Sequence, residues 1–175
     1  MIGVLQELKD KSLNVRIGQK DNIAKHIAGK LYNKLVIIYS SSIHFDAVAT
    51  RFRGQLAENS KCLASSHVFP EMNHNEITGW RNPKKLFKDF IVLMFRDKGM
   101  HKRTSIRMDI TRDILKNEQV NVLEVSSRGE NLLSRIFSLI YIGDFVSFYL
   151  AILYGIDPTP VDRVTYLKKR LAENK

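Results

Sequence analysis

The sequence predicts an α/β fold, a three-layer sandwich in which helices flank a mainly parallel, flavodoxin-like sheet. Two observations lead to this prediction. Short apolar runs of strand length recur along the chain and are apolar throughout, which is typical of strands buried on both faces of a parallel sheet. Helical patterns lie between those runs, and alternating strands and helices favour an open α/β sandwich.

Four strands are expected. Leu35 to Tyr39 (LVIIY), Ile91 to Phe95 (IVLMF) and Val120 to Val125 (VNVLEV) are rich in β-branched and large apolar residues. Cys62 to Phe69 is a weaker fourth run. Each has the usual length of a strand in a globular protein.

Helices are expected between the strands. Asp21 to Leu31 has Asp21 as an acidic start, and Phe45 to Leu56 repeats apolar residues at helical spacing. Thr104 to Lys116 carries Ile106, Ile110 and Ile114 on one face. No repeats or low-complexity segments interrupt the pattern.

The C-terminal third is more apolar than the rest. Within the apolar stretch of residues 131–156, Ile136 to Ile156 is long enough to cross a membrane. Gly143 and Asp144 near its centre favour one buried helix, or two meeting at Gly143. Thr159 suits the N-cap of a last helix and Pro160 its first position. That helix is expected to reach about Leu171, with Val161, Val164 and Leu167 facing inward.

Size and charge narrow the function. A chain of 175 residues with a 44% hydrophobic content fits one domain. A net charge of +10 suits an anionic partner, but it is diffuse and no nucleic-acid motif accompanies it, so neither a nucleic-acid nor a membrane partner is expected. One cysteine, Cys62, and no signal peptide at the start favour a reducing, cytoplasmic setting.

Glu58 and His74 are the leading candidates for chemistry, because a carboxylate and an imidazole are the usual groups for proton transfer at neutral pH. Glu58 lies in ENSK and His74 in NHNE, at the two ends of the Cys62 to Phe69 run. By spacing alone, a surface glutamate paired with Lys61 is the favoured interpretation of Glu58. His74 could be an exposed histidine beside a helix-capping asparagine.

Other polar residues give weaker signals. Ser40, Ser41 and Ser42 follow a predicted strand and could hold a phosphate, although no glycine-rich loop accompanies them and a plain polar loop is the alternative. His67, Glu71, His74 and Glu76 match no compact metal motif, so no metal is expected. Cys62 has no base beside it, and Lys168 is by default a surface lysine.

Four segments together resemble the C-terminal half of the bifunctional phosphoglucose/phosphomannose isomerase family, whose members contain two sugar isomerase (SIS) domains. They are QLAENSK, FPEMNHNEITGW, YIGDFVSFYLA and DPTPVDRVTYLKKRL, in the family's order. The likeness covers residues 22–175, which implies a C-terminal SIS domain after a linker-like segment of residues 1–21.

The resemblance implies aldose–ketose isomerisation of glucose or mannose 6-phosphate to fructose 6-phosphate through an enediol, with no cofactor. It gives Glu58 the role of the base between C1 and C2. His74 would assist ring opening and reach into a partner subunit's site, and Lys168 would polarise a sugar oxygen. The substrate-binding positions expected beside them are Ser40, Ser41, Asn59, Lys61, Asn73 and Asn75.

Two departures from the family set limits on this interpretation. Ala57 stands where the family usually has asparagine. The glycine-glycine-serine loop and the serine/threonine-rich phosphate loop of the family's N-terminal domain do not occur in this sequence. The chain is therefore expected to act as a half-unit that needs a homodimer or a complementary N-terminal SIS domain. A non-catalytic sugar-phosphate-binding or dimerisation module is the alternative.

Overall fold

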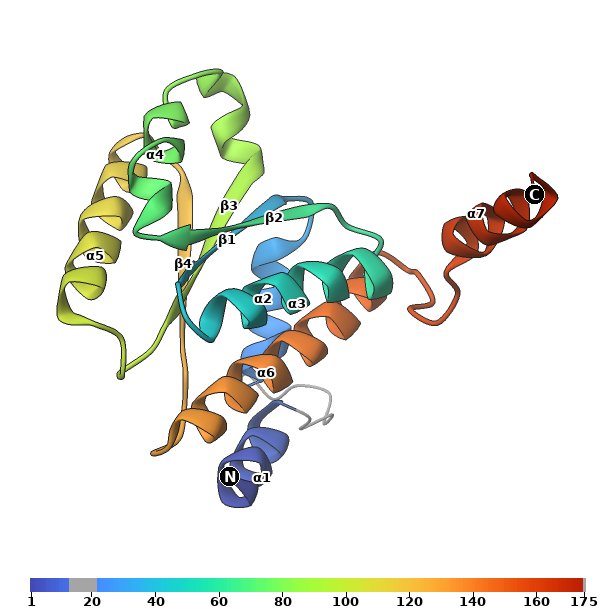
Figure 1. Cartoon of the computed structure of the whole chain (residues 1–175), viewed down its shortest axis with the longest axis horizontal. Coiled ribbons are helices and arrows are strands. Elements are labelled where there is room, and N and C mark those ends of the chain that lie inside the picture. The colour runs from blue at the N-terminus through green and yellow to red at the C-terminus, as the bar shows by residue number, and fades with distance from the viewer. Residues whose placement is uncertain (13–21, 175) are drawn as a thin grey trace.

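A computed structural model describes residues 1–12 and 22–174. Its centre is a parallel sheet with the strand order β2-β1-β3-β4, made of β1 (Leu35–Ser41), β2 (Ala64–Phe69), β3 (Phe90–Arg96) and β4 (Asn121–Ser126). The predicted parallel α/β sandwich is confirmed (Figure 1). The four expected strands are present, with bounds that differ by one or two residues at most ends.

Four helices cover one face of the sheet: α1 (Ile2–Ser12), α2 (Ile23–Leu31), α3 (Phe45–Asn59) and α6 (Leu132–Leu153). Asn22 caps α2 by accepting a hydrogen bond from the backbone amide of Lys25 at 2.9 Å. Asp21, the acidic start expected from the sequence, lies outside the described residues. The larger hydrophobic core of the protein lies between these helices and the sheet.

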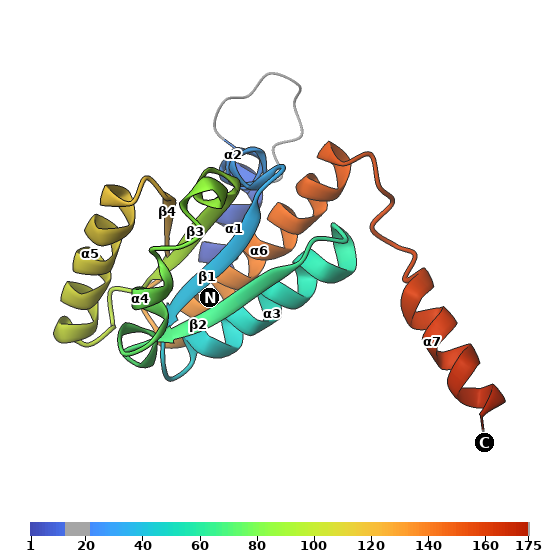
Figure 2. The ribbon, with the colours of Figure 1, turned by 90° about the horizontal axis from the view of Figure 1, so that it is seen from above.

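The opposite face is covered by η1 (Glu71–Asn73), α4 (Glu76–Gly79), η2 (Lys84–Asp89) and α5 (Lys102–Asn117). A smaller core lies beneath them, built around Tyr39, Trp80 and Met108. Figure 2 shows the two helical layers on either side of the sheet. The two layers bury the middle of β1 and β3 on both faces, as their continuous apolar sequences predict.

Helix α6 is continuous through Gly143, so the single-helix alternative is the one observed. Within the described residues it is the one helix long and apolar enough to cross a membrane, but half of that apolar stretch is buried against the rest of the protein. Ser134, Ser138 and Ser147 are buried along it, and each hydroxyl makes a hydrogen bond. These features are those of a core helix of an α/β domain.

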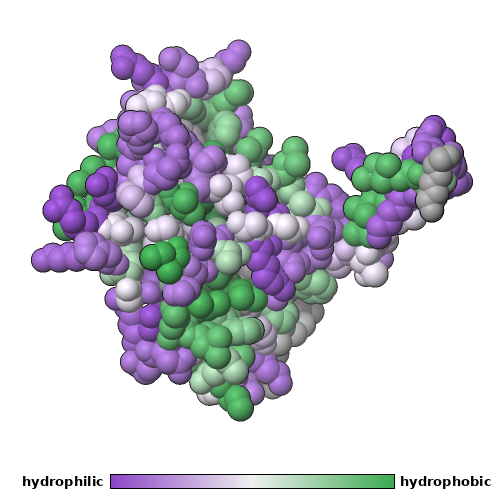
Figure 3. Space-filling model, viewed as in Figure 1, coloured by the Kyte–Doolittle hydropathy of each residue, from purple (hydrophilic) through white to green (hydrophobic). Residues whose placement is uncertain are grey.

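Helix α7 (Asp162–Glu173) stands away from the sheet at the end of an extended connection (Figure 2). Its N-cap is Val161, so the predicted start at Thr159 and Pro160 is wrong. The inward packing expected for Val161, Val164 and Leu167 is also wrong, because all three are exposed. Figure 3 shows apolar side chains on the surface of this arm. The periodicity identified an apolar face correctly, but that face has no partner surface within the described residues.

The N-terminal segment, expected to be linker-like, contains helix α1. Leu8 of α1 is fully buried in the larger core, and α1 packs along α6. The domain boundary after residue 21 stays a prediction.

Candidate functional site at the ends of strand β2

Glu58 and His74 lie at opposite ends of β2. Glu58 is in the last turn of α3, just before β2 begins, and His74 follows η1 after β2 ends. The six residues of β2 span roughly 20 Å at the rise of an extended strand. The two side chains therefore cannot serve one substrate within a single copy of this domain.

Glu58 is exposed at the amino-terminal edge of the sheet. Lys61 does not pair with its carboxylate: the Lys61 ammonium donates to the backbone carbonyl of Glu58 at 2.5 Å and to that of Pro158 at 3.2 Å. The carboxylate itself has no hydrogen-bond or ion-pair partner among the described residues. It is an unpaired carboxylate on an exposed surface, beside a lysine whose ammonium is bonded to two backbone carbonyls.

Lys61 brings together two segments that are far apart in the sequence. The turn that contains Glu58 and Lys61 meets the stretch Asp157-Pro158-Thr159-Pro160. There, the carboxylate of Asp157 accepts a hydrogen bond from the backbone amide of Thr159, and this bond, with the nearby charge of Lys61, lowers the pKa of Asp157. The segments QLAENSK and DPTPVDRVTYLKKRL thus contact each other and form one local cluster.

Asn59 and Ser60 fasten this edge to α6. The Asn59 amide donates to the Ser147 hydroxyl at 2.8 Å, and the Ser60 hydroxyl donates to the Ser147 carbonyl at 2.8 Å. Asn59 is thus occupied by a structural contact, and the substrate-binding role expected for it stays a prediction. Lys61 is exposed and lies directly beside Glu58, but its ammonium is likewise bonded to two backbone carbonyls, so its substrate-binding role also stays a prediction.

His74 is exposed, and its segment is held from both sides. Asn75 accepts a hydrogen bond from the backbone amide of Glu76 as the N-cap of α4, and its amide donates to the Glu71 carboxylate at 2.7 Å. The Asn73 amide donates to the Thr111 hydroxyl of α5 at 3.0 Å. The sequence pattern of a helix start is therefore confirmed, and neither asparagine is bonded to the imidazole.

A buried network supports the His74 segment, and the sequence pattern alone did not reveal it. Tyr39 of β1 donates to the Glu76 carboxylate at 2.6 Å and accepts a hydrogen bond from the Trp80 indole at 2.7 Å. His67 of β2 forms an ion pair with Glu76. Glu76 and Trp80 are the glutamate and the tryptophan of NHNEITGW, so the motif itself contains two members of the network.

This network changes the protonation of its members. Burial raises the pKa of Glu76, although the Tyr39 hydrogen bond and the charge of His67 oppose the rise. Burial and the neighbouring Glu76 raise the pKa of Tyr39, which stays a phenol. Among the described residues, no three histidine, cysteine or carboxylate side chains group as metal ligands would.

Ser40 and Ser41, where a phosphate site was expected, lie at the carboxyl edge of the sheet. Both serines are buried, and the Ser40 hydroxyl has no hydrogen-bond partner in the described part of the chain. At the end of the neighbouring strand β3, Arg135 donates to the buried Asp97 at 2.7 Å. A guanidinium that could bind phosphate is thus already neutralised, and the role of the two serines stays a prediction.

Lys168 lies on α7, away from both clusters, and is exposed. The connection that leads to α7 starts from the cluster of Glu58 and Lys61, because Pro158 contacts Lys61. The segment that connects α6 to α7 therefore passes beside Glu58, the candidate base. Lys168 itself contacts neither Glu58 nor His74.

Comparison with known proteins finds relatives that are longer than this chain. The curated relatives include the bifunctional phosphoglucose/phosphomannose isomerases of Caldicellulosiruptor bescii, 45% identical over 99% of this chain, and of Aquifex aeolicus, 36% identical over 95%. This chain spans 51% and 53% of the length of those two proteins. It therefore corresponds to about half of each relative.

Solved structures share the fold. A glucose-6-phosphate isomerase-like protein from Thermus thermophilus superposes with a TM-score of 0.71 at 22% identity, over 89% of this chain and 50% of that one. The model of the bacterial phosphoglucose isomerase C-terminal SIS domain matches residues 20–171. The chain belongs to the family of bacterial phosphoglucose isomerase C-terminal SIS domains.

Proposed function

We propose that this chain is the base-carrying half of a sugar-phosphate isomerase that interconverts glucose or mannose 6-phosphate with fructose 6-phosphate. The observation that carries the proposal is the unpaired, exposed Glu58 carboxylate, held beside Lys61 and the root of the α7 arm. Relatives that bear the name of this activity are up to 45% identical to the chain.

In the proposed mechanism Glu58 takes the proton from C2 of the open-chain aldose and returns it to C1, while the hydroxyl proton on the C2 oxygen is lost and the C1 oxygen gains a proton. One carboxylate can serve both carbons because the enediol between them is planar and both lie on the same face. Lys61 lies next to Glu58 and can bind a sugar hydroxyl or the enediolate oxygen. Lys168 would polarise a sugar oxygen once α7 docks over the site.

His74 is proposed to assist ring opening in a site other than that of its own Glu58. The separation of the two residues by the length of β2 supports this assignment. The second site would belong to another copy of the chain, so the proposed active unit is a homodimer in which each copy also has a complementary N-terminal SIS domain. A cytoplasmic location is proposed with this function.

The phosphate group is proposed to be held by the complementary N-terminal SIS domain. This division of labour is supported by the buried serines and by the Asp97–Arg135 pair at the carboxyl edge. The same observations favour the alternative function, a non-catalytic sugar-phosphate-binding or dimerisation module. The isomerase requires Glu58 for turnover, whereas the non-catalytic module has no turnover with or without Glu58.

The test joins this chain to the N-terminal half of the Caldicellulosiruptor bescii relative and measures conversion of each hexose 6-phosphate to fructose 6-phosphate. Glu58→Gln should lower kcat by about 100-fold to 10,000-fold, the usual contribution of a general base. Glu130→Gln is the matched control, because Glu130 is 94% exposed and lies in a distant loop. Turnover retained in Glu58→Gln contradicts the proposed base.

Isotope exchange separates the two functions. If Glu58 shuttles the proton, deuterium from solvent enters the sugar at C2 with the native chain and not with Glu58→Gln. Calorimetric binding of the hexose 6-phosphates without turnover or exchange would instead support the non-catalytic module.

A further inference from the structure

The direction in which His74 points depends on the backbone that carries it, because its side chain has no partner. The imidazole is exposed and makes no hydrogen bond, ion pair or ring contact with the other described residues. A group that transfers a proton must lie within hydrogen-bond reach of its target. The backbone of residues 73–75 therefore needs a firm support if His74 is to act on a sugar.

Helix α5 supports the segment on the side that precedes His74. The Asn73 amide donates to the Thr111 hydroxyl at 3.0 Å and to the Met72 sulfur at 3.3 Å. Thr111 and Met72 are each 1% exposed. The amide oxygen of Asn73 is also buried and has no partner in the described part of the chain. Loss of the Thr111 hydroxyl would therefore leave this amide with a weak sulfur acceptor alone.

Glu76 supports the segment on the side that follows His74. Its carboxylate accepts a hydrogen bond from Tyr39 of β1 and forms an ion pair with His67 of β2. Asn75 bonds to residues of the same segment. The side-chain bonds thus tie the segment to the sheet after His74 and to α5 before it.

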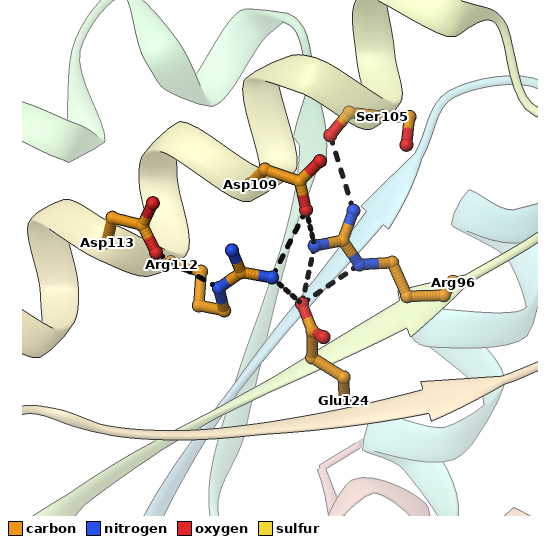
Figure 4. Close-up of polar contacts among 6 residues, drawn as sticks. All are labelled: Arg96, Ser105, Asp109, Arg112, Asp113 and Glu124. Atoms are coloured by element: carbon orange, nitrogen blue, oxygen red, sulfur yellow. Dashed lines mark hydrogen bonds and ion pairs between the residues drawn. The ribbon is translucent and has the colours of Figure 1, made fainter.

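Helix α5 is a rigid support because Arg96 fixes it to the sheet (Figure 4). The Arg96 guanidinium, at the end of β3, donates to the Asp109 carboxylate at 2.7 Å and to the Ser105 carbonyl at 3.3 Å, both in α5. It also donates to Glu124 of β4 at 2.9 Å. The Arg96 side chain is 14% exposed, so these charged hydrogen bonds are partly shielded from water. Thr111, two residues beyond Asp109, is held at a fixed position by them.

We propose that Thr111 is a positioning residue for His74: its hydroxyl, carried by α5, fixes Asn73 and so sets the direction of the imidazole. This inference rests on the proposed function, in which His74 assists ring opening. That step breaks the bond between C1 and the ring oxygen, moves the proton of the C1 hydroxyl to the ring oxygen and leaves an aldehyde. A displacement of about 1 Å in a group that takes part can cost about 100-fold in rate.

The first measurement tests the support itself in the isolated chain. Thr111→Val keeps the shape of the side chain and removes the hydroxyl, so the amides of residues 73–76 should exchange with solvent about threefold to tenfold faster, as loss of one hydrogen bond predicts. Thr111→Ser keeps the hydroxyl and should leave this exchange within about twofold. Thr104→Val, the same change seven residues earlier on α5, is the matched control.

The second measurement tests ring opening. The chain is joined to the N-terminal half of the Caldicellulosiruptor bescii relative and carries Glu58→Gln, so that interconversion of the two anomers of glucose 6-phosphate reports ring opening without isomerisation. Exchange NMR gives this rate above the uncatalysed one. Thr111→Val should lower it at least about tenfold, and Thr111→Ser should keep it within about twofold. His74→Ala gives the rate without the imidazole.

Binding of gluconate 6-phosphate separates positioning from a general loss of structure. This open-chain analogue has no ring to open, so its Kd, measured by calorimetry, should stay within about twofold in Thr111→Val. A purely structural role would weaken this binding and slow ring opening together.

Three results would overturn the proposal. They are unchanged amide exchange at residues 73–76 in Thr111→Val, an equal rise of exchange in β3, and a loss of ring opening in Thr111→Val no larger than in Thr104→Val. Isomerisation that persists in Glu58→Gln would contradict the proposed base and leave the role of Thr111 standing. No catalysed interconversion with native Thr111 would contradict the role proposed for His74, and this inference with it.

Discussion

The ammonium of Lys61 donates to the backbone carbonyl of Pro158, 97 residues further along the chain, at 3.2 Å. Lys61 also has a left-handed backbone, with φ at 57°, in the turn between α3 and β2. A residue other than glycine is strained in that region by about 1 kcal/mol. Glycine would adopt this backbone conformation more easily than lysine. The Lys61 side chain contacts the segment that connects α6 to α7.

We expect Lys61→Gly to separate these two effects. Relief of the backbone strain should offset the loss of an exposed hydrogen bond, so the free energy of unfolding should change by less than about 1 kcal/mol. Amide exchange at residues 157–160 should become faster. Lys98→Gly, in a distant loop, is the control, and unchanged exchange at residues 157–160 in Lys61→Gly would show that the contact does not hold this segment.

Tyr39→Phe should destabilise the protein more than its small change in volume suggests. The substitution removes the donor to Glu76, in a partly buried setting, and the acceptor for the Trp80 indole, in a buried one. Buried polar groups that lose a partner cost about 1–3 kcal/mol each. Urea denaturation should show a loss in that range, and a loss below about 0.5 kcal/mol would mean that water replaces the phenol.

Glu76 makes stability depend on pH with a definite sign. Because burial raises its pKa in the folded state, the native protein binds this proton more tightly than the unfolded chain does. The stability that the group contributes is complete at low pH, and it falls as pH rises from the ordinary glutamate range, about 4 to 5, through the raised pKa.

The substitution Glu76→Gln removes that titration. Relative to the native protein, its free energy of unfolding should therefore increase as pH rises from the ordinary glutamate range through the raised pKa of Glu76. Urea denaturation at several pH values gives this difference. A difference that moves in the opposite direction would mean that the His67 ion pair lowers the pKa of Glu76 below its ordinary value.

Gly54 and Gly143 should respond to alanine with opposite signs. At Gly54 of α3 a new Cβ meets nothing within 4 Å, so better helix propensity should stabilise the protein by about 0.5–1 kcal/mol. At Gly143 of α6 the Cβ would lie 2.8 Å from Cδ2 of the buried Phe52. Overpacking of about 1–3 kcal/mol should exceed the gain in propensity. Thermal unfolding of both variants checks the pair, and equal shifts would show that Phe52 moves aside.

The strands and their order of appearance could be predicted from the sequence because burial on both faces of a sheet leaves an unmistakable apolar run. All residues of Val36 to Tyr39 and of Ile91 to Phe95 are buried. Helical faces were harder. Ile106, Ile110 and Ile114 have the spacing of a core face, yet Met108, Thr111 and Leu115 face the sheet. Periodicity identifies an apolar face, and only the rest of the protein decides what covers it.

The candidate site, too, could be predicted only in part. The positions of Glu58 and His74 at the two ends of β2 follow from the order of elements, which the sequence provides. The partners of Lys61 and Tyr39 do not, because Pro158 is 97 and Glu76 is 37 residues away, and side-chain contacts at such separations depend on the finished fold. The NHNEITGW segment pointed to His74, whereas its Glu76 and Trp80 turn out to join the buried network that supports it.

Removal of α7 should affect function without affecting the fold. Every described residue of the helix is exposed, including the apolar Val164, Leu167 and Leu171. A helix of twelve residues is marginal in water unless it packs on another surface. We therefore expect α7 to be stabilised only when its apolar face docks on another surface, which we take to be the complementary N-terminal domain.

The truncation that ends at Val161 tests this expectation. In the isolated chain it should change the free energy of unfolding by less than about 0.5 kcal/mol, the usual range for exposed positions. In the protein joined to an N-terminal SIS half, the same truncation and Lys168→Ala should both lower turnover, while Lys169→Ala should not. A large loss of stability in the isolated chain would mean that α7 packs on this domain instead, and equal effects of the two lysine substitutions would remove Lys168 from the proposed site.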